Sequence, residues 1–137
     1  LALIAPEHQR NPGVLEVRWA LPAHARQWDA ALDIARTLMA ATPNRASGWL
    51  HQAYALRRVP DGGVQKAWEA LLPAGDKFPK EPTIPFNLSC YACQLQQLDT
   101  ARDWLKRAVA VGGKEKIKQM ALQDSDLKPL WDEIRQL

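Results

Sequence analysis

The chain has 137 residues, of which 47% are apolar and 24% charged, a composition ordinary for one folded globular domain. Its 18 basic and 15 acidic residues leave a net charge of +3 with no run of five like charges, so the sequence lacks the basic stripe of nucleic-acid-binding proteins. No apolar run is long enough to span a bilayer, and the two cysteines do not suggest a disulfide-stapled secreted module, so we expect a cytoplasmic protein.

Residues 1–8 resemble the end of a helix from a preceding repeat, and a first repeat follows over about residues 12–45. We expect the first helix of this repeat over about residues 13–21, because Pro22 lacks the amide hydrogen that would continue the helical ladder. The second helix spans about residues 26–41 and ends at a Thr-Pro-Asn break.

A second repeat occupies about residues 46–81. Its first helix carries Trp49, Ala53 and Leu56, whose spacings of four and three residues place them on one face. A Pro-Asp-Gly-Gly turn then precedes the second helix, which begins near Val64.

A third repeat occupies about residues 82–115. Pro85 lies in the first turn of its first helix, where the missing amide hydrogen costs little, and Thr83 or Ile84 is expected as the N-cap. The second helix of this repeat is ended by the glycines at 112–113.

The remaining residues, about 116–137, are predicted to form a C-terminal capping helix pair. We expect its helices over about residues 114–122 and 126–137, with Pro129 tolerated in the first turn of the second. The chain is thus predicted to be a single helical repeat domain.

One pattern of small and apolar residues recurs at an interval of about 34 to 36 residues, the period of helix-turn-helix repeats. Small side chains at Ala31, Ala67 and Ala101 allow two helices of a repeat to approach closely. Since no single helix pair buries its apolar face, at least three pairs have to stack. The fold class predicted is all-α, an α-solenoid of antiparallel helix pairs. The three copies are Trp28-x₂-Ala31-x₃-Ala35-x₂-Leu38, Val64-x₂-Ala67-x₃-Leu71-x₂-Ala74 and Leu98-x₂-Ala101-x₃-Leu105-x₂-Ala108.

These residues resemble the tetratricopeptide repeat family. The family motif is Trp-x₂-Leu-Gly-x₂-Tyr in the first helix, Ala-x₃-Phe in the second helix and a closing proline. The first repeat departs from the motif, because Trp19 and Pro22 replace the small residue and the aromatic. The resemblance covers about residues 12–115. The second repeat matches at Trp49, Ala53, Ala67, Leu71 and Pro79, and the third at Leu88, Ser89, Ala101 and Leu105.

The resemblance implies first helices that line a concave groove, which holds an extended peptide or a partner helix. Asn87 matches a position where family members present an amide to a peptide backbone. Leu50, Thr83 and Phe86 stand in place of the basic residues of the carboxylate-clamp subclass, so we do not expect a clamp for chaperone tails. The residues carried over to the groove are Glu16, His51, Tyr54, Arg58, Phe86, Asn87, Cys90 and Gln94.

The pair Cys90 and Cys93 has the spacing of redox and metal-binding thiols. Redox pairs sit at a helix N-terminus, which lowers the thiol pKa, whereas this pair falls in mid-helix. A zinc site needs two further ligands, and the histidines at 8, 24 and 51 lack ligand spacing. We expect two soft packing residues and predict no catalytic, metal or cofactor site. A thiol-dependent enzyme or metal protein is kept as the weakest alternative.

The tryptophans are expected to serve mainly in packing rather than in stacking on sugars or bases. Trp131 should pack the last helix onto the array, and the repeat pattern gives no role to Trp19. Those at or beside repeat-packing positions are Trp28, Trp49, Trp68 and Trp104.

The function predicted from these observations is a non-catalytic protein–protein interaction module whose groove binds a peptide or helix of a partner. Tyr54 and Phe86 would supply apolar area, and Asn87, Gln94 and Arg58 would fix polar groups. We expect no cofactor, no nucleic acid and no membrane partner. The alternative is a self-associating scaffold, a homo-oligomer or part of a larger repeat array.

Overall fold

The secondary structure of the described residues is entirely helical. The computed structural model describes residues 12–24 and 26–137, and these ranges contain no strand. The all-α prediction is therefore confirmed, whereas the solenoid arrangement of helix pairs stays a prediction. Residues 1–8, expected to end an earlier helix, lie outside the described ranges.

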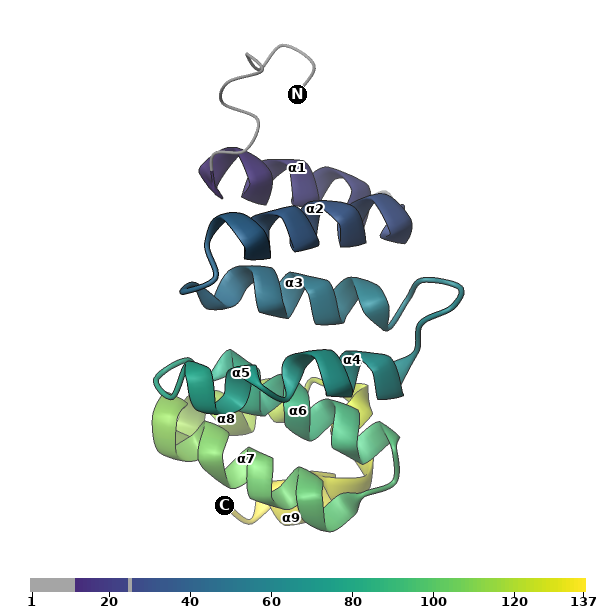
Figure 1. Ribbon diagram of the computed structural model, residues 1–137. Helices are drawn as coiled ribbons and strands as arrows, with labels where there is room; N and C mark the ends of the chain where they lie inside the picture. The colour runs from purple at the N-terminus through teal and green to yellow at the C-terminus, as the bar shows by residue number, and fades with distance from the viewer. Residues whose placement is uncertain (1–11, 25) are drawn as a thin grey trace. The chain divides into compact units, whose positions relative to one another are not determined.

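The chain divides into two compact units, residues 1–70 and 71–137. In the first unit α1 packs against α2, and α2 packs against α3, so these helices lie side by side in chain order (Figure 1). The helices are α1 (Pro12–His24), α2 (Trp28–Ala41), α3 (Ala46–Leu56) and α4 (Val64–Leu71), and the last residue of α4 belongs to the second unit.

Small residues bring the helices of the first unit together. Ala31 and Ala55 are fully buried in one cluster with Leu32. A side-chain carbon added at Gly48 on α3 would come within 2.9 Å of the Met39 amide nitrogen on α2, so only glycine permits this approach. Close backbone contact lets dispersion and apolar burial act over the whole helix face.

In the second unit α6 and α7 pack against each other, and α8, η2 and α9 complete the core. The Ser89 hydroxyl of α6 donates a 2.8 Å hydrogen bond to the Ala101 carbonyl of α7. Trp131 packs the last helix as expected, because its indole donates to the Ala121 carbonyl of α8 at 2.9 Å. The elements are α5 (Ala74–Lys77), α6 (Thr83–Gln94), α7 (Leu98–Gly112), α8 (Lys114–Ala121), the 3₁₀ helix η2 (Ser125–Leu130) and α9 (Trp131–Arg135).

The repeated pattern has a repeated local structure. The residue two before α2, Arg26, and the residue two before α7, Gln96, have φ angles of 59° and 62°. The residues that follow them have φ and ψ angles of −93° and 75° before α2, and −98° and 73° before α7. The amides of the alanines at 31, 67 and 101 donate to the carbonyl four residues earlier, at 3.0, 3.1 and 2.9 Å. The pattern therefore places its alanine at the same step of the helical ladder three times, and the backbone that leads into α2 and α7 is the same.

The prediction that α1 stops before Pro22 is wrong, because α1 continues through Pro22 to His24. The proline removes one amide donor near the end of the helix, but its ring is buried and its carbonyl accepts the Gln27 amide at 2.6 Å. The start expected for the next helix is also two residues early. Arg26 has a left-handed backbone, so α2 begins at Trp28.

Two further corrections concern helix ends in the second unit. Thr83 lies inside α6, so neither it nor Ile84 is the N-cap, and the Glu81 carboxylate accepts the Thr83 amide at 3.2 Å. The last expected helix is a 3₁₀ segment followed by the short α9. Pro129 lies in that 3₁₀ segment, which begins where Asp124 accepts the Asp126 amide at 3.0 Å.

Candidate functional site

The residues predicted to line one groove fall into both units. Glu16, His51, Tyr54 and Arg58 belong to the first unit, whereas the other four lie on α6 in the second. The first four meet on one side of α3, and two of the second four contact the segment 124–126. Each set therefore has its own environment and is described in its own unit.

An aromatic cluster on the first unit consists of Trp19, Trp28, His51, Tyr54 and Arg58. His51, Tyr54 and Arg58 are three and four residues apart, so α3 and the turn after it present them on one face. The Trp19 and His51 rings stack with centroids 3.9 Å apart at 20°. Tyr54 meets Trp19 edge-on at 6.0 Å and Trp28 at 5.6 Å. The contacts of Tyr54 lie in the range of distances that aromatic pairs prefer, and together with the stacked pair they form one packed cluster.

Arg58 is held over this cluster without being buried. Its guanidinium carbon lies 3.6 Å from the Tyr54 ring centroid and 5.2 Å from that of Trp28. Its Nη1 donates to the Tyr54 carbonyl at 2.8 Å. Arg58 is exposed and Tyr54 is 41% exposed. The cation–π contact thus fixes a planar cation and a phenol ring at the surface.

A polar contact between α1 and α3 supports the cluster from one side. Glu16 Oε2 lies 2.7 Å from His51 Nε2, the ring that stacks on Trp19. Burial raises the pKa of Glu16, but hydrogen bonds from Ser47 and His51, together with the charges of His51 and Arg45, outweigh it and leave the pKa below 4.5. The charged carboxylate is therefore favoured in the folded state and helps to orient His51.

Trp19 and Trp28 were not predicted as site residues from the sequence. For Trp19 the signal was its position, because the repeat motif has a small residue there. A ring too large for close helix contact turns toward α3, where it stacks on His51. Trp28 was expected to serve in packing, and it is half-buried beside the core. It also belongs to the aromatic cluster, because its ring contacts Tyr54 and Arg58.

The four predicted residues of the second unit have mixed surroundings. Phe86 is buried at 5% exposure, which favours packing, and Asn87 is half-buried. The Cys90 thiol lies 3.6 Å from Asp124 Oδ2, and the exposed Gln94 donates to the Asp126 carbonyl at 3.1 Å. Cys90 and Gln94 thus connect α6 to the start of η2.

The predicted thiol pair lies in the interior of the second unit. Cys90 and Cys93 are both buried and reduced. Burial raises the pKa of the Cys93 thiol, and the charges of Asp126 and Asp124 raise it further against the opposing charge of Arg102. The neutral thiol is a poor nucleophile and a poor metal ligand. Cys90, Asp124 and Asp126 place ligand atoms within 4.8 Å of one another, but Asp124 already caps η2.

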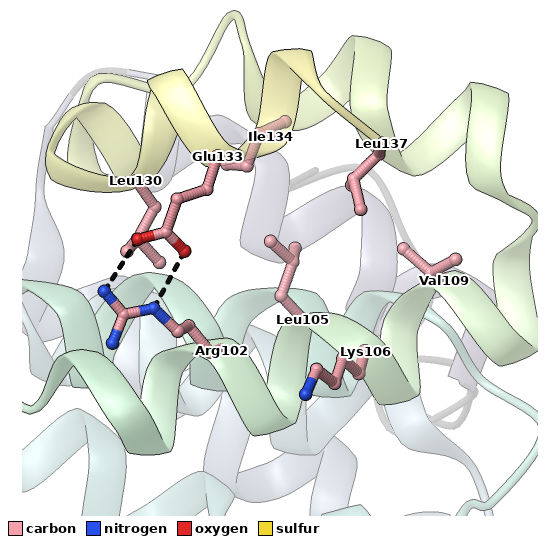
Figure 2. Close-up of a pocket in the computed structure, with 8 residues that line it drawn as sticks. All are labelled: Arg102, Leu105, Lys106, Val109, Leu130, Glu133, Ile134 and Leu137. Carbon is pink, nitrogen blue, oxygen red and sulfur yellow. Dashed lines mark hydrogen bonds and ion pairs between the residues drawn. The ribbon is translucent and has the colours of Figure 1, made fainter.

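A cavity of about 200 Å³ lies between α7 and α9 in the second unit (Figure 2). We call it the α7–α9 cavity. Charged residues line its rim: Arg102 and Lys106 from α7, and Glu133 from α9. This cavity was not predicted from the sequence, although residues 130, 134 and 137 have the spacing of one apolar helix face. The apolar lining is Leu105, Val109, Leu130, Ile134 and Leu137.

An ion pair closes one end of this cavity. Arg102 donates to both oxygens of Glu133, from Nε at 2.8 Å and from Nη2 at 2.7 Å, as the dashed lines in Figure 2 show. A third bond from Arg102 Nη1 reaches Asp99 at 2.7 Å. The hydrogen bonds from Arg102 lower the pKa of Glu133, so its carboxylate stays charged. The bidentate geometry holds α9 to α7 at this point.

Comparisons of the chain with models of protein families, with curated proteins and with solved structures give no match. The tetratricopeptide assignment therefore stays a prediction that depends on the repeated pattern. Among the described residues, none of the helices has the length and apolar character needed to cross a bilayer.

Proposed function

We propose that this chain is a non-catalytic protein-interaction module that binds a peptide or helix of a partner protein at the aromatic cluster of the first unit. The observation that carries the proposal is the contact of Arg58 with the Tyr54 ring at 3.6 Å, in which both residues are exposed. Tyrosine, tryptophan and arginine are enriched among the few residues that dominate the binding energy of protein interfaces. A surface on which these side chains are already ordered loses little entropy when a partner binds.

The free groups of the cluster indicate the chemistry of the bound segment. Arg58 uses one N–H for the Tyr54 carbonyl, and no described residue accepts its remaining donors. A carboxylate or a peptide carbonyl of the partner would accept them. The exposed part of the Tyr54 ring offers apolar area beside them. The segment expected is therefore a peptide that carries an apolar side chain next to an acidic group.

The repeat resemblance supports the same class of function. Family members bind peptides on their first helices, and His51 and Tyr54 lie on α3, the first helix of the second repeat. Asn87 and Gln94 of α6 stay predicted contacts, and the buried Phe86 is left out of the proposal.

Selection from a random peptide library tests this function without a known partner. Peptides are selected on the wild-type protein, and their affinities are measured for wild type, for Arg58→Ala and for Arg58→Lys. We expect Arg58→Ala to weaken the selected peptides about thirtyfold, the effect of losing an interface hot spot. Arg58→Lys keeps the charge but loses the planar donors, so it should recover only a small part of the affinity.

Arg36→Ala is the matched control, because Arg36 is exposed on α2 and makes none of these ring contacts. It should leave the affinities unchanged. Failure to enrich any saturable binder, or binders that Arg58→Ala does not weaken, would remove the basis of the proposal.

Self-association is a second candidate, and one observation favours it. Leu21 of α1 is 55% exposed, so a second copy of the chain that covers it would remove apolar area from water. If this side chain lies in a self-contact, sedimentation at increasing concentration detects a dimer, and Leu21→Lys dissociates it. A monomer at every concentration excludes this candidate.

A further inference from the structure

We propose that the α7–α9 cavity binds a small amphiphilic carboxylate, with its apolar tail in the cavity and its carboxylate paired with Lys106. This site lies within the second unit and is independent of the peptide-binding function proposed for the first. The ligand class is a medium-chain fatty acid or an organic acid of the same size and polarity.

The size and lining of the cavity determine the tail. Five of its lining residues are aliphatic, so an apolar group enters without leaving a polar atom unpaired. A dry cavity of about 150 Å³ lined by such residues binds benzene in another protein. By this comparison a cavity of about 200 Å³ holds roughly six to eight carbon atoms. Longer tails would extend into solvent.

The charges around the cavity determine the head group. Arg102 and Glu133 neutralise each other through two hydrogen bonds, and Asp99 takes a third donor of Arg102. Lys106 makes no ion pair with any described residue, and its four-carbon side chain lies along α7 at the edge of the cavity (Figure 2). Among the lining residues Lys106 is therefore the cation without an ion pair, and the carboxylate of a ligand would supply one.

The other charged groups nearby are already engaged or remote from the lining. Lys118 of α8 donates to the main-chain oxygen of Leu137 at 3.2 Å, so its ammonium group faces that end of the chain. Arg107, the neighbour of Lys106, lies over the Trp104 ring and reaches Asp76 at 3.3 Å. Lys106 is thus the group that distinguishes an anionic amphiphile from a cationic one of equal length.

An NMR titration of the ¹⁵N-labelled full chain tests both parts of the proposal. The probes are octanoate and octylammonium, which share one tail and differ in the sign of the head group. Octanoate should shift the amides of α7 and α9 and bind about fivefold more tightly than octylammonium, the worth of one exposed ion pair. In Lys106→Glu the preference should reverse. In Val109→Trp, where the indole fills the cavity, both probes should lose binding.

Lys116→Glu is the matched control, because Lys116 is exposed on α8 outside the lining and its replacement changes the net charge equally. It should keep the preference for octanoate. Equal affinity for the two probes, no saturable binding, or octanoate shifts that survive Val109→Trp would overturn the proposal. A dimer that Val109→Trp dissociates would also overturn it, since a second copy would then fill the cavity. None of these results affects the peptide test at Arg58.

Discussion

Trp19 in the first unit and Ser89 in the second stand at the same place in the repeated pattern, twelve residues before Ala31 and Ala101. Ser89 is fully buried and donates to the Ala101 carbonyl, so α6 and α7 touch. Trp19 is half-buried, and its ring stacks on His51 of α3. One position of the pattern therefore gives a packing contact in one unit and an aromatic surface in the other.

One local pattern thus leads to different surfaces in the two units. The helix starts of both units share their backbone angles, so the scaffold is the same locally. The difference lies in side-chain size at a position where the scaffold favours a small residue. In the first unit the large ring supports His51, and with it the face that carries Tyr54 and Arg58. The surface that we propose for binding thus lies where the sequence departs from the pattern.

Exchanging the large residue into the second unit should have the largest effect. Ser89→Trp places an indole where α6 and α7 are in contact and removes the bond to Ala101. We expect a loss of about 3 kcal/mol or more in the free energy of unfolding, measured by urea denaturation. Ser89→Ala, which removes only the hydroxyl, should cost about 1 kcal/mol. A Ser89→Trp protein with the wild-type urea midpoint would show that the two positions are not equivalent.

Removing the large residue from the first unit should have an intermediate effect. Trp19→Ala loses the ring stack on His51 and part of the packing on the core, which we expect to cost about 2 kcal/mol because the side chain is only half-buried. Trp19→Phe keeps a stacking ring and should cost less than about 1 kcal/mol. Equal losses in the two variants would mean that the ring contact contributes nothing.

The same left-handed backbone conformation precedes α2 in the first unit and α7 in the second. Arg26 and Gln96 have φ near +60°, which costs a side-chain-bearing residue about 1 kcal/mol. We therefore expect Arg26→Gly and Gln96→Gly each to raise the free energy of unfolding by about 0.5 kcal/mol, once the greater entropy of glycine in the unfolded chain is subtracted. The midpoint of thermal unfolding should rise accordingly. Gly63 also has a positive φ, 124°, and already is a glycine. The reverse substitution, Gly63→Ala, should therefore destabilise the protein by about 1 kcal/mol. A destabilised Arg26→Gly protein would contradict this account.

The elements that depend on spacing and on strong breakers were predictable. Val64 begins α4 and the glycines at 112–113 end α7, because periodicity and local breakers decide these features. The continuation of α1 through Pro22 was not predictable, since burial of the ring and a bond from the Gln27 amide outweigh the lost donor. At this position tertiary packing outweighs the low helix propensity of proline.

The candidate site was predictable only in part. The spacing of His51, Tyr54 and Arg58 on one helix face could be seen in the sequence, and the structure places these three together. The contact of Glu16 with His51 joins residues 35 positions apart, which no local pattern specifies. The apolar residues of the α7–α9 cavity were visible as a stripe, but whether a stripe is filled or hollow depends on the exact packing of α9.

The smallest effect expected is that of the Glu16 charge on the first unit. Its pKa lies below 4.5 in the folded protein, so its contribution to stability is complete above pH 4.5 and is lost as the pH falls through the folded pKa. Because the side chain is 39% exposed, we expect Glu16→Gln to cost only about 0.5 kcal/mol at pH 7. The stability gap between wild type and variant, measured by urea denaturation at each pH, should close in acid. Ser47→Ala, which removes a hydrogen bond to Glu16, should narrow the same gap at pH 7. A gap that widens below pH 4.5 would mean that the carboxylate opposes folding, and the support of His51 by Glu16 would then have to be abandoned.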